Sequence, residues 1–74
     1  MPKLPNLSGK VVISKLERLG YKVVRQKGSH VRLKHSDSSF HKPITVPLHS
    51  SIKPGLLHNI IKDAGLSLEE FIDL

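Results

Sequence analysis

Residues 29–35 constrain the fold of this chain more than any other stretch, because apolar and basic side chains alternate along them. Successive side chains of a β-strand point to opposite faces of a sheet, so the alternation predicts a strand with one apolar and one basic face. Val31 and Leu33 form the apolar face. The basic face carries His30, Arg32 and Lys34.

Two further strands are expected beside this one. Gly28 favours a hairpin turn before it, because glycine adopts positive φ without penalty. Residues 21–26 have the β-propensity of the partner strand, but the adjacent Val23 and Val24 would face opposite sides and leave its register open. The third strand is expected over residues 43–48, where flanking prolines favour a sheet edge.

Helical patterns flank these strands. Ser8 is a suitable N-cap for a first amphipathic helix. Ser50 or Ser51, together with Pro54, marks the start of a second helix. Residues 67–70 have the Ser-x-x-Glu spacing of a capping box, which predicts a short third helix.

The length and element order indicate the architecture. At 74 residues the chain has room for one domain of two thin layers, so residues 1–74 are expected to form a single unit. The order α-β-β-β-α, followed by a short C-terminal helix, predicts an α+β two-layer sandwich whose helices cover the apolar face of the sheet. The absence of cysteine and of any long apolar run favours a cytoplasmic location.

Charge is distributed unevenly along the sequence. All twelve Lys and Arg residues lie within residues 1–62, together with only two acidic residues, whereas residues 63–74 carry four acidic residues. A polyanion such as nucleic acid would be attracted by the first part of the chain and repelled by the last. Lysine-rich surfaces also keep small proteins soluble, so charge alone leaves both interpretations open.

His30 is the candidate for chemistry on a phosphodiester. Cleavage of RNA by its own 2′-OH needs a base with a pKa near neutrality, and imidazole is such a base. Cations near the phosphorus would stabilise the developing charge. The alternative is a purely structural role for His30 in the hairpin.

Several other residues are expected to hold RNA phosphates, including the start of the second helix, where free N–H groups attract anions. The predicted RNA-binding residues are Lys27, Ser29, Arg32, Lys34, His49 and Lys53. His49 is also the candidate proton donor to the leaving group.

The five histidines do not predict a metal site. His30 and His35 are an odd number of residues apart on one strand and would point to opposite faces, and no cysteine or carboxylate cluster joins them. The sequence also lacks a phosphate-binding loop and a dinucleotide motif. Neither a metal nor a cofactor is therefore expected.

Six short motifs follow one another along the chain. They are Ser8-Gly9-Lys10, Gly20-Tyr21, Gly28-Ser29-His30-Val31-Arg32-Leu33, Val46-Pro47-Leu48-His49-Ser50, Lys53-Pro54-Gly55 and Ala64-Gly65-Leu66-Ser67. In this order they resemble the HicA toxins, the mRNA interferases of HicA–HicB toxin–antitoxin pairs. The resemblance implies a double-stranded-RNA-binding-domain-like fold and metal-independent endoribonuclease activity on mRNA, with His30 as the catalytic residue. It also implies neutralisation by a HicB-type antitoxin protein.

Two other functions are compatible with the same pattern. A non-catalytic module that binds double-stranded RNA would share the element order but would not need the imidazole of His30. A subunit that contacts DNA is the third interpretation, since a basic face attracts either nucleic acid.

Overall fold

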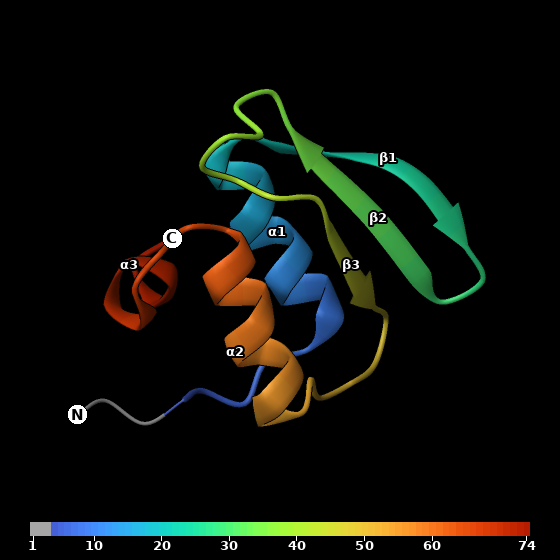
Figure 1. Cartoon of the computed structure of the whole chain (residues 1–74). Helices are drawn as coiled ribbons and strands as arrows, with labels where there is room; N and C mark the ends of the chain where they lie inside the picture. Colours follow the sequence, from blue (N-terminus) through green and yellow to red (C-terminus); the bar gives the residue numbers. More distant parts are fainter. Residues whose placement is uncertain (1–3) are drawn as a thin grey trace.

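The computed structural model describes residues 4–74, which form three helices and a three-stranded antiparallel sheet (Figure 1). In chain order the elements are α1 (Gly9–Leu19), β1 (Tyr21–Lys27), β2 (His30–His35), β3 (Ile44–Pro47), α2 (Pro54–Asp63) and α3 (Leu68–Ile72). The predicted α-β-β-β-α order with a short C-terminal helix is confirmed. Residues 1–3 of the expected domain lie outside the described residues.

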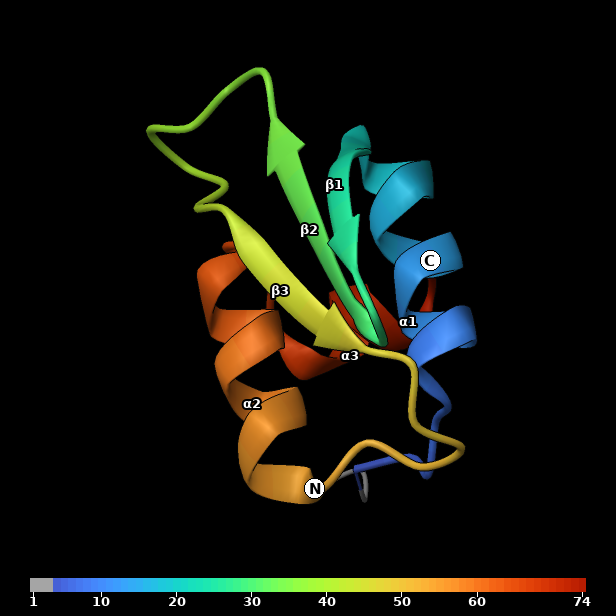
Figure 2. The same cartoon turned by 90° about the vertical axis from the view of Figure 1, so that its right-hand side faces the viewer.

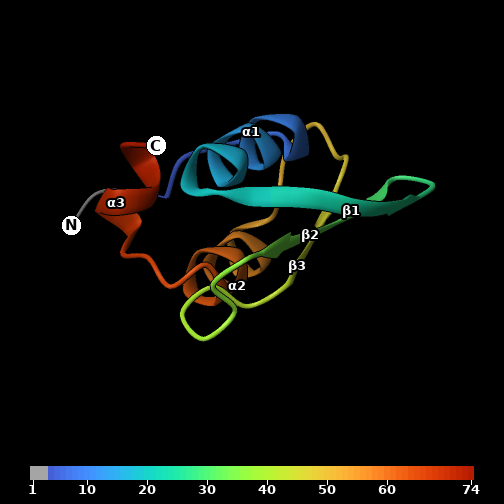
Figure 3. The same ribbon diagram turned by 90° about the horizontal axis from the view of Figure 1, so that it is seen from above.

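The sheet has the order β1-β2-β3, so the basic strand β2 lies in the middle (Figure 2). The two longer helices lie on one side of the sheet, α1 against β1 and β3 and α2 against β3 (Figure 1). The turn between β1 and β2 projects beyond both helices (Figure 3). The other side of the sheet is therefore left open.

The core fills the space between the sheet and the helices, as the alternation in β2 predicts. Val31 and Leu33 are buried there, whereas Leu48 is 40 % exposed and lies beyond the end of β3. The expectation that the third strand runs to residue 48 is therefore wrong. The chain leaves the sheet after Pro47, and the main chain of His49 instead accepts a hydrogen bond from the N–H of Gly9 (2.9 Å).

A β-bulge in β1 settles the register that the two valines left open. Val23 lies opposite Leu33 and Arg25 lies opposite Arg32, so the intervening Val24 has no partner on β2. In a regular strand Val23 and Arg25 would share one face. The extra residue shifts the alternation and moves Arg25 to the open face.

The observed helix caps match those predicted from the sequence only in part. The Ser8 hydroxyl accepts a hydrogen bond from the N–H of Val11 (3.2 Å), as expected for an N-cap. The capping box predicted at residues 67–70 is present in full. Helix α2 begins at Pro54, as predicted, but its N-cap is Lys53 and neither Ser50 nor Ser51. The Ser51 hydroxyl donates to Asn6 instead, which ties this loop to the segment before α1.

No helix within residues 4–74 combines the length and the apolar character needed to cross a membrane. The longest, α1, has eleven residues, about half of what a bilayer span requires.

Candidate functional site

His30 is the first residue of β2, and its ring is exposed on the open side of the sheet. Its neighbours across the sheet are Lys27 of β1 and Pro47 of β3. Within the described part of the chain, no hydrogen bond engages the imidazole. The turn is held by another side chain, because the amide of Gln26 donates to the carbonyl of Gly28 (3.1 Å). Within these residues, His30 can therefore bind a ligand without breaking a hydrogen bond of its imidazole.

A hollow of about 280 Å³ opens beside the His30 ring. Its lining residues are Arg25, Lys27, His30, Arg32 and Thr45. The strands β1, β2 and β3 contain no Asp or Glu, so cations surround the imidazole and no carboxylate of the sheet competes for them. Such a site suits an anion that must be held next to a base.

The hydroxyl of Thr45 fixes one of these cations. Arg32 and Thr45 are cross-strand neighbours, and Nη1 of the half-buried Arg32 donates to Oγ1 of Thr45 at 3.0 Å. The bond restrains a long side chain in the hollow, which lowers the conformational entropy that it would lose on binding a phosphate. Thr45 therefore supports the site without carrying charge.

A second hollow of about 360 Å³ adjoins the first along the strands. It is lined by Val24, Arg25, Arg32 and Lys34. Because Arg25 and Arg32 line both hollows, the predicted residues Lys27, His30, Arg32 and Lys34 lie along one continuous surface.

The remaining predicted residues lie outside this surface. Ser29 is in the turn, where its carbonyl accepts the N–H of Leu48 (2.7 Å). The His49 side chain lines a different hollow, next to the start of α1. Lys53 caps α2 through its backbone alone and makes no side-chain capping bond. The structure thus brings together four of the seven predicted site residues and separates Ser29, His49 and Lys53 from them.

Arg25 and Thr45 are site residues that the sequence pattern does not reveal. Arg25 reaches the hollow only because of the bulge at Val24, and the neighbouring Val23 and Val24 are its one visible signal. Thr45 occupies the expected polar face of the third strand, but nothing in the sequence indicates its bond to Arg32. Both residues depend on pairing between strands.

Two other histidines have structural roles. The rings of His35 and His41 lie 4.2 Å apart between centroids, and both stack edge-on against Tyr21. His35 Nε2 lies 3.0 Å from the carbonyl of Leu19, and His41 Nδ1 lies 2.5 Å from that of Ala64. These contacts link the loop before β3 to the ends of α1 and α2. Among residues 4–74, no group of three or more His, Cys, Asp or Glu side chains could hold a metal ion.

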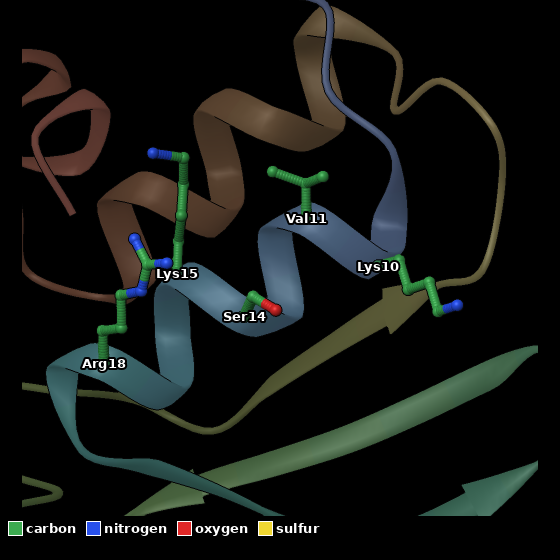
Figure 4. Close-up of a pocket in the computed structure, with 5 residues that line it drawn as sticks. All are labelled: Lys10, Val11, Ser14, Lys15 and Arg18. Atoms are coloured by element: carbon green, nitrogen blue, oxygen red, sulfur yellow. The ribbon is translucent and has the colours of Figure 1, made fainter.

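Another hollow, of about 400 Å³, lies on the outer face of α1 (Figure 4). Its lining residues are Lys10, Val11, Ser14, Lys15 and Arg18. It is basic but contains no imidazole, carboxylate or thiol. It shares Lys10 with the hollow that His49 lines. The hollow beside His30 is the one that places an imidazole among several cations.

The family model described as HicA toxin of bacterial toxin-antitoxin matches residues 9–66, which is more than half of the chain. The chain belongs to the HicA toxin family. This HicA protein is thus the toxin of a toxin–antitoxin system, and the matched span contains every residue of both hollows on the sheet. The comparison with curated proteins gave no significant match.

Proposed function

We propose that this HicA toxin is a metal-independent endoribonuclease that cleaves mRNA, with His30 as the catalytic residue. One observation carries the proposal: an exposed imidazole, free of hydrogen bonds within residues 4–74, stands in a hollow otherwise lined by three cations and one hydroxyl. A ribonuclease that uses the 2′-OH of its substrate needs this combination of base and positive charge.

The neutral imidazole of His30 accepts the proton of a ribose 2′-OH. The 2′-oxygen then forms a bond to phosphorus, and the bond from phosphorus to the 5′-oxygen of the next nucleotide breaks. The products are a 2′,3′-cyclic phosphate and a free 5′-hydroxyl, so the step needs no oxidant and no metal ion. A general acid protonates the leaving oxygen. The predicted donor, His49, lines a different hollow from His30, so we assign this role to no residue.

The basic side chains supply the electrostatic part of catalysis. Arg25, Lys27 and Arg32 surround the space where the phosphate sits and stabilise the charge that builds on it in the transition state. Arginine suits this task because its guanidinium can donate two parallel hydrogen bonds to a phosphate. Lys34 extends the positive surface, and Lys53 and Ser29 are proposed as contacts to more distant parts of the RNA.

A HicB-type antitoxin is the proposed protein partner, and the cytoplasm, where mRNA is translated, is the proposed location. An acidic protein that covers the open face of the sheet would neutralise the cations and block His30 together. Co-expression of such a partner should relieve growth arrest caused by the toxin. Continued arrest, despite a complex that survives purification, would argue against occlusion of the site.

Incubation of the purified protein with a single-stranded RNA in excess chelator tests the activity. We expect fragments that end in a 2′,3′-cyclic phosphate. The same sequence with 2′-O-methyl groups at every ribose should be bound but not cut, because it lacks the attacking hydroxyl. RNA that is bound and left intact would indicate a binding module instead, and cleavage of the methylated strand would rule out the 2′-OH mechanism.

A further inference from the structure

The open side of the β1–β2 hairpin carries an unusual set of neighbours. All three cross-strand pairs on this side join two basic residues: Lys22 with Lys34, Arg25 with Arg32, and Lys27 with His30. Two of these pairs, Lys22 with Lys34 and Arg25 with Arg32, place like charges directly opposite each other, which destabilises the folded state. A bound polyanion would remove that repulsion along the whole hairpin.

The two adjoining hollows form a groove that is lined by five of these six residues, while Lys22 lies beside Lys34 and lines neither hollow. The two hollows that share Arg25 and Arg32 run from His30 at the start of β2 to Lys34 near its end. Val24, the unpaired residue of the bulge, is 53 % exposed and lines the second hollow. An apolar side chain between cations suits a nucleotide, whose base and sugar are less polar than its phosphate.

The length of the groove sets the number of nucleotides that it holds. A strand rises about 3.3 Å per residue, so about 13 Å separates His30 from Lys34 along β2. One strand of stacked nucleic acid rises about 3.4 Å per phosphate and extends further when unstacked. The pair of Lys22 and Lys34 therefore meets a phosphate roughly two to four nucleotides from the one beside His30.

We propose that an RNA strand lies lengthwise along the β1–β2 hairpin and that Lys22 and Lys34 form a distal phosphate subsite. The cleaved phosphate lies at His30 and the pair of arginines, and the nucleotides between the two sites pass over Val24. This inference rests on the proposed ribonuclease function and adds to it the path of the substrate along the sheet. It also makes cleavage depend on substrate length.

The double variant Lys22→Ala/Lys34→Ala tests the subsite on two substrates, a ten-nucleotide RNA and a dinucleotide that is too short to reach it. On the long RNA we expect KM to rise about tenfold with kcat unchanged, and we expect the salt dependence of affinity to become shallower. On the dinucleotide the variant should lose much less than on the long RNA, because only the long RNA reaches the distal subsite. Arg18→Ala/Lys62→Ala is the matched control, because it also removes two exposed cations, each in the last turn of a helix on the other side of the sheet.

An equal loss on both substrates, or a loss no greater than that of the control, would overturn the distal subsite. Binding of the 2′-O-methyl decamer keeps this test separate from catalysis, because it needs no cleavage. If the wild type cuts no RNA but the double variant alone binds the decamer about tenfold more weakly, the ribonuclease proposal fails and the subsite stands. If the wild type cuts RNA and both variants bind the decamer equally well, the distal subsite fails and the ribonuclease proposal stands.

Discussion

At the scale of a single residue, the neutral side chain of Thr45 positions the charged side chain of Arg32 for phosphate binding. Its hydroxyl accepts a hydrogen bond from Arg32 and holds the guanidinium in the hollow beside His30. Without that bond the arginine would lose more conformational freedom when a phosphate binds. Thr45 is thus a positioning residue, because it acts through Arg32.

Thr45→Val keeps the shape of the side chain and removes the hydroxyl. We expect kcat/KM for RNA cleavage to fall about two- to tenfold, since a hydrogen bond of this kind contributes about 0.5–1.5 kcal/mol. Thr45→Ser keeps the hydroxyl and should restore most of the activity. Equal activity of the valine and serine variants, at unchanged melting temperature, would show that the bond has no functional effect.

The sequence identifies some residues of the site and misses others for a physical reason. The alternation in β2 is a local property, so it is enough by itself to place His30, Arg32 and Lys34 on one face. The position of Arg25 depends on the bulge. After Val24, the side chains of β1 point to the opposite face from the one that regular alternation would give them. No local pattern in the sequence fixes that change.

At the scale of elements, the start of α1 approaches the end of β3 closely. Gly9 opens α1 and is buried, and a Cβ atom at this position would lie only 2.0 Å from the carbonyl oxygen of Pro47. The helix can approach the strand this closely only because glycine lacks a side chain. The loop that carries His49 is held at the same place, since Gly9 donates to its carbonyl.

Gly9→Ala should therefore lower the free energy of unfolding by about 2 kcal/mol or more, because backbone must move to make room. Gly55→Ala is the matched control: it lies in the first turn of α2, nothing lies within 4 Å of its added Cβ, and alanine is the better helix former. Urea unfolding of both variants measures the difference. Equal stabilities would mean that α1 can shift away from β3 without cost.

The sequence predicts the type and order of the elements better than their ends. Periodicity and β-propensity extend over whole segments, and a capping box marks the third helix, so the sequence indicates all six elements. Pro54 marks the first residue of α2 correctly. Ser50 and Ser51 precede the helix, and the hydroxyl of Ser51 is bound to Asn6 in a distant segment. Contacts between distant segments decide such boundaries.

Charge is segregated in space at the scale of the whole molecule. The acidic segment that contains α3 lies far from the hairpin turn (Figure 1). It is held there by Lys15 of α1, whose Nζ donates to the carbonyls of Ile72 (3.0 Å) and Leu74 (2.9 Å) and lies 5.7 Å from the ring centroid of the buried Phe71. The open face of the sheet therefore keeps its positive potential.

Tyr21 joins three parts of the molecule and gives the stability a distinctive dependence on pH. Its hydroxyl donates to the carbonyl of Lys42 (2.7 Å), and burial, aided by the charge of Asp63, raises the pKa of Tyr21 from 10.0 to about 12. Between these values the unfolded chain loses the phenolic proton while the folded chain keeps it. The free energy of unfolding should therefore fall as the pH rises from about 10 to 12.

Tyr21→Phe removes this titration, and Tyr21 is the only tyrosine in the chain. Urea unfolding at pH 9 and pH 11 should show a smaller loss of stability for the variant than for the wild type, because lysine titration affects both proteins alike. A loss of the same size in both would mean that Tyr21 does not contribute to alkaline unfolding.

Cleavage of RNA by His30→Ala, measured at saturating substrate beside the wild type, tests the central claim most directly. His58→Ala is the matched control, because it removes an exposed histidine from α2. We predict that His30→Ala melts and binds RNA like the wild type but cuts it about 10²- to 10⁴-fold more slowly, whereas His58→Ala retains full activity. Cleavage at the wild-type rate by folded His30→Ala would contradict the account.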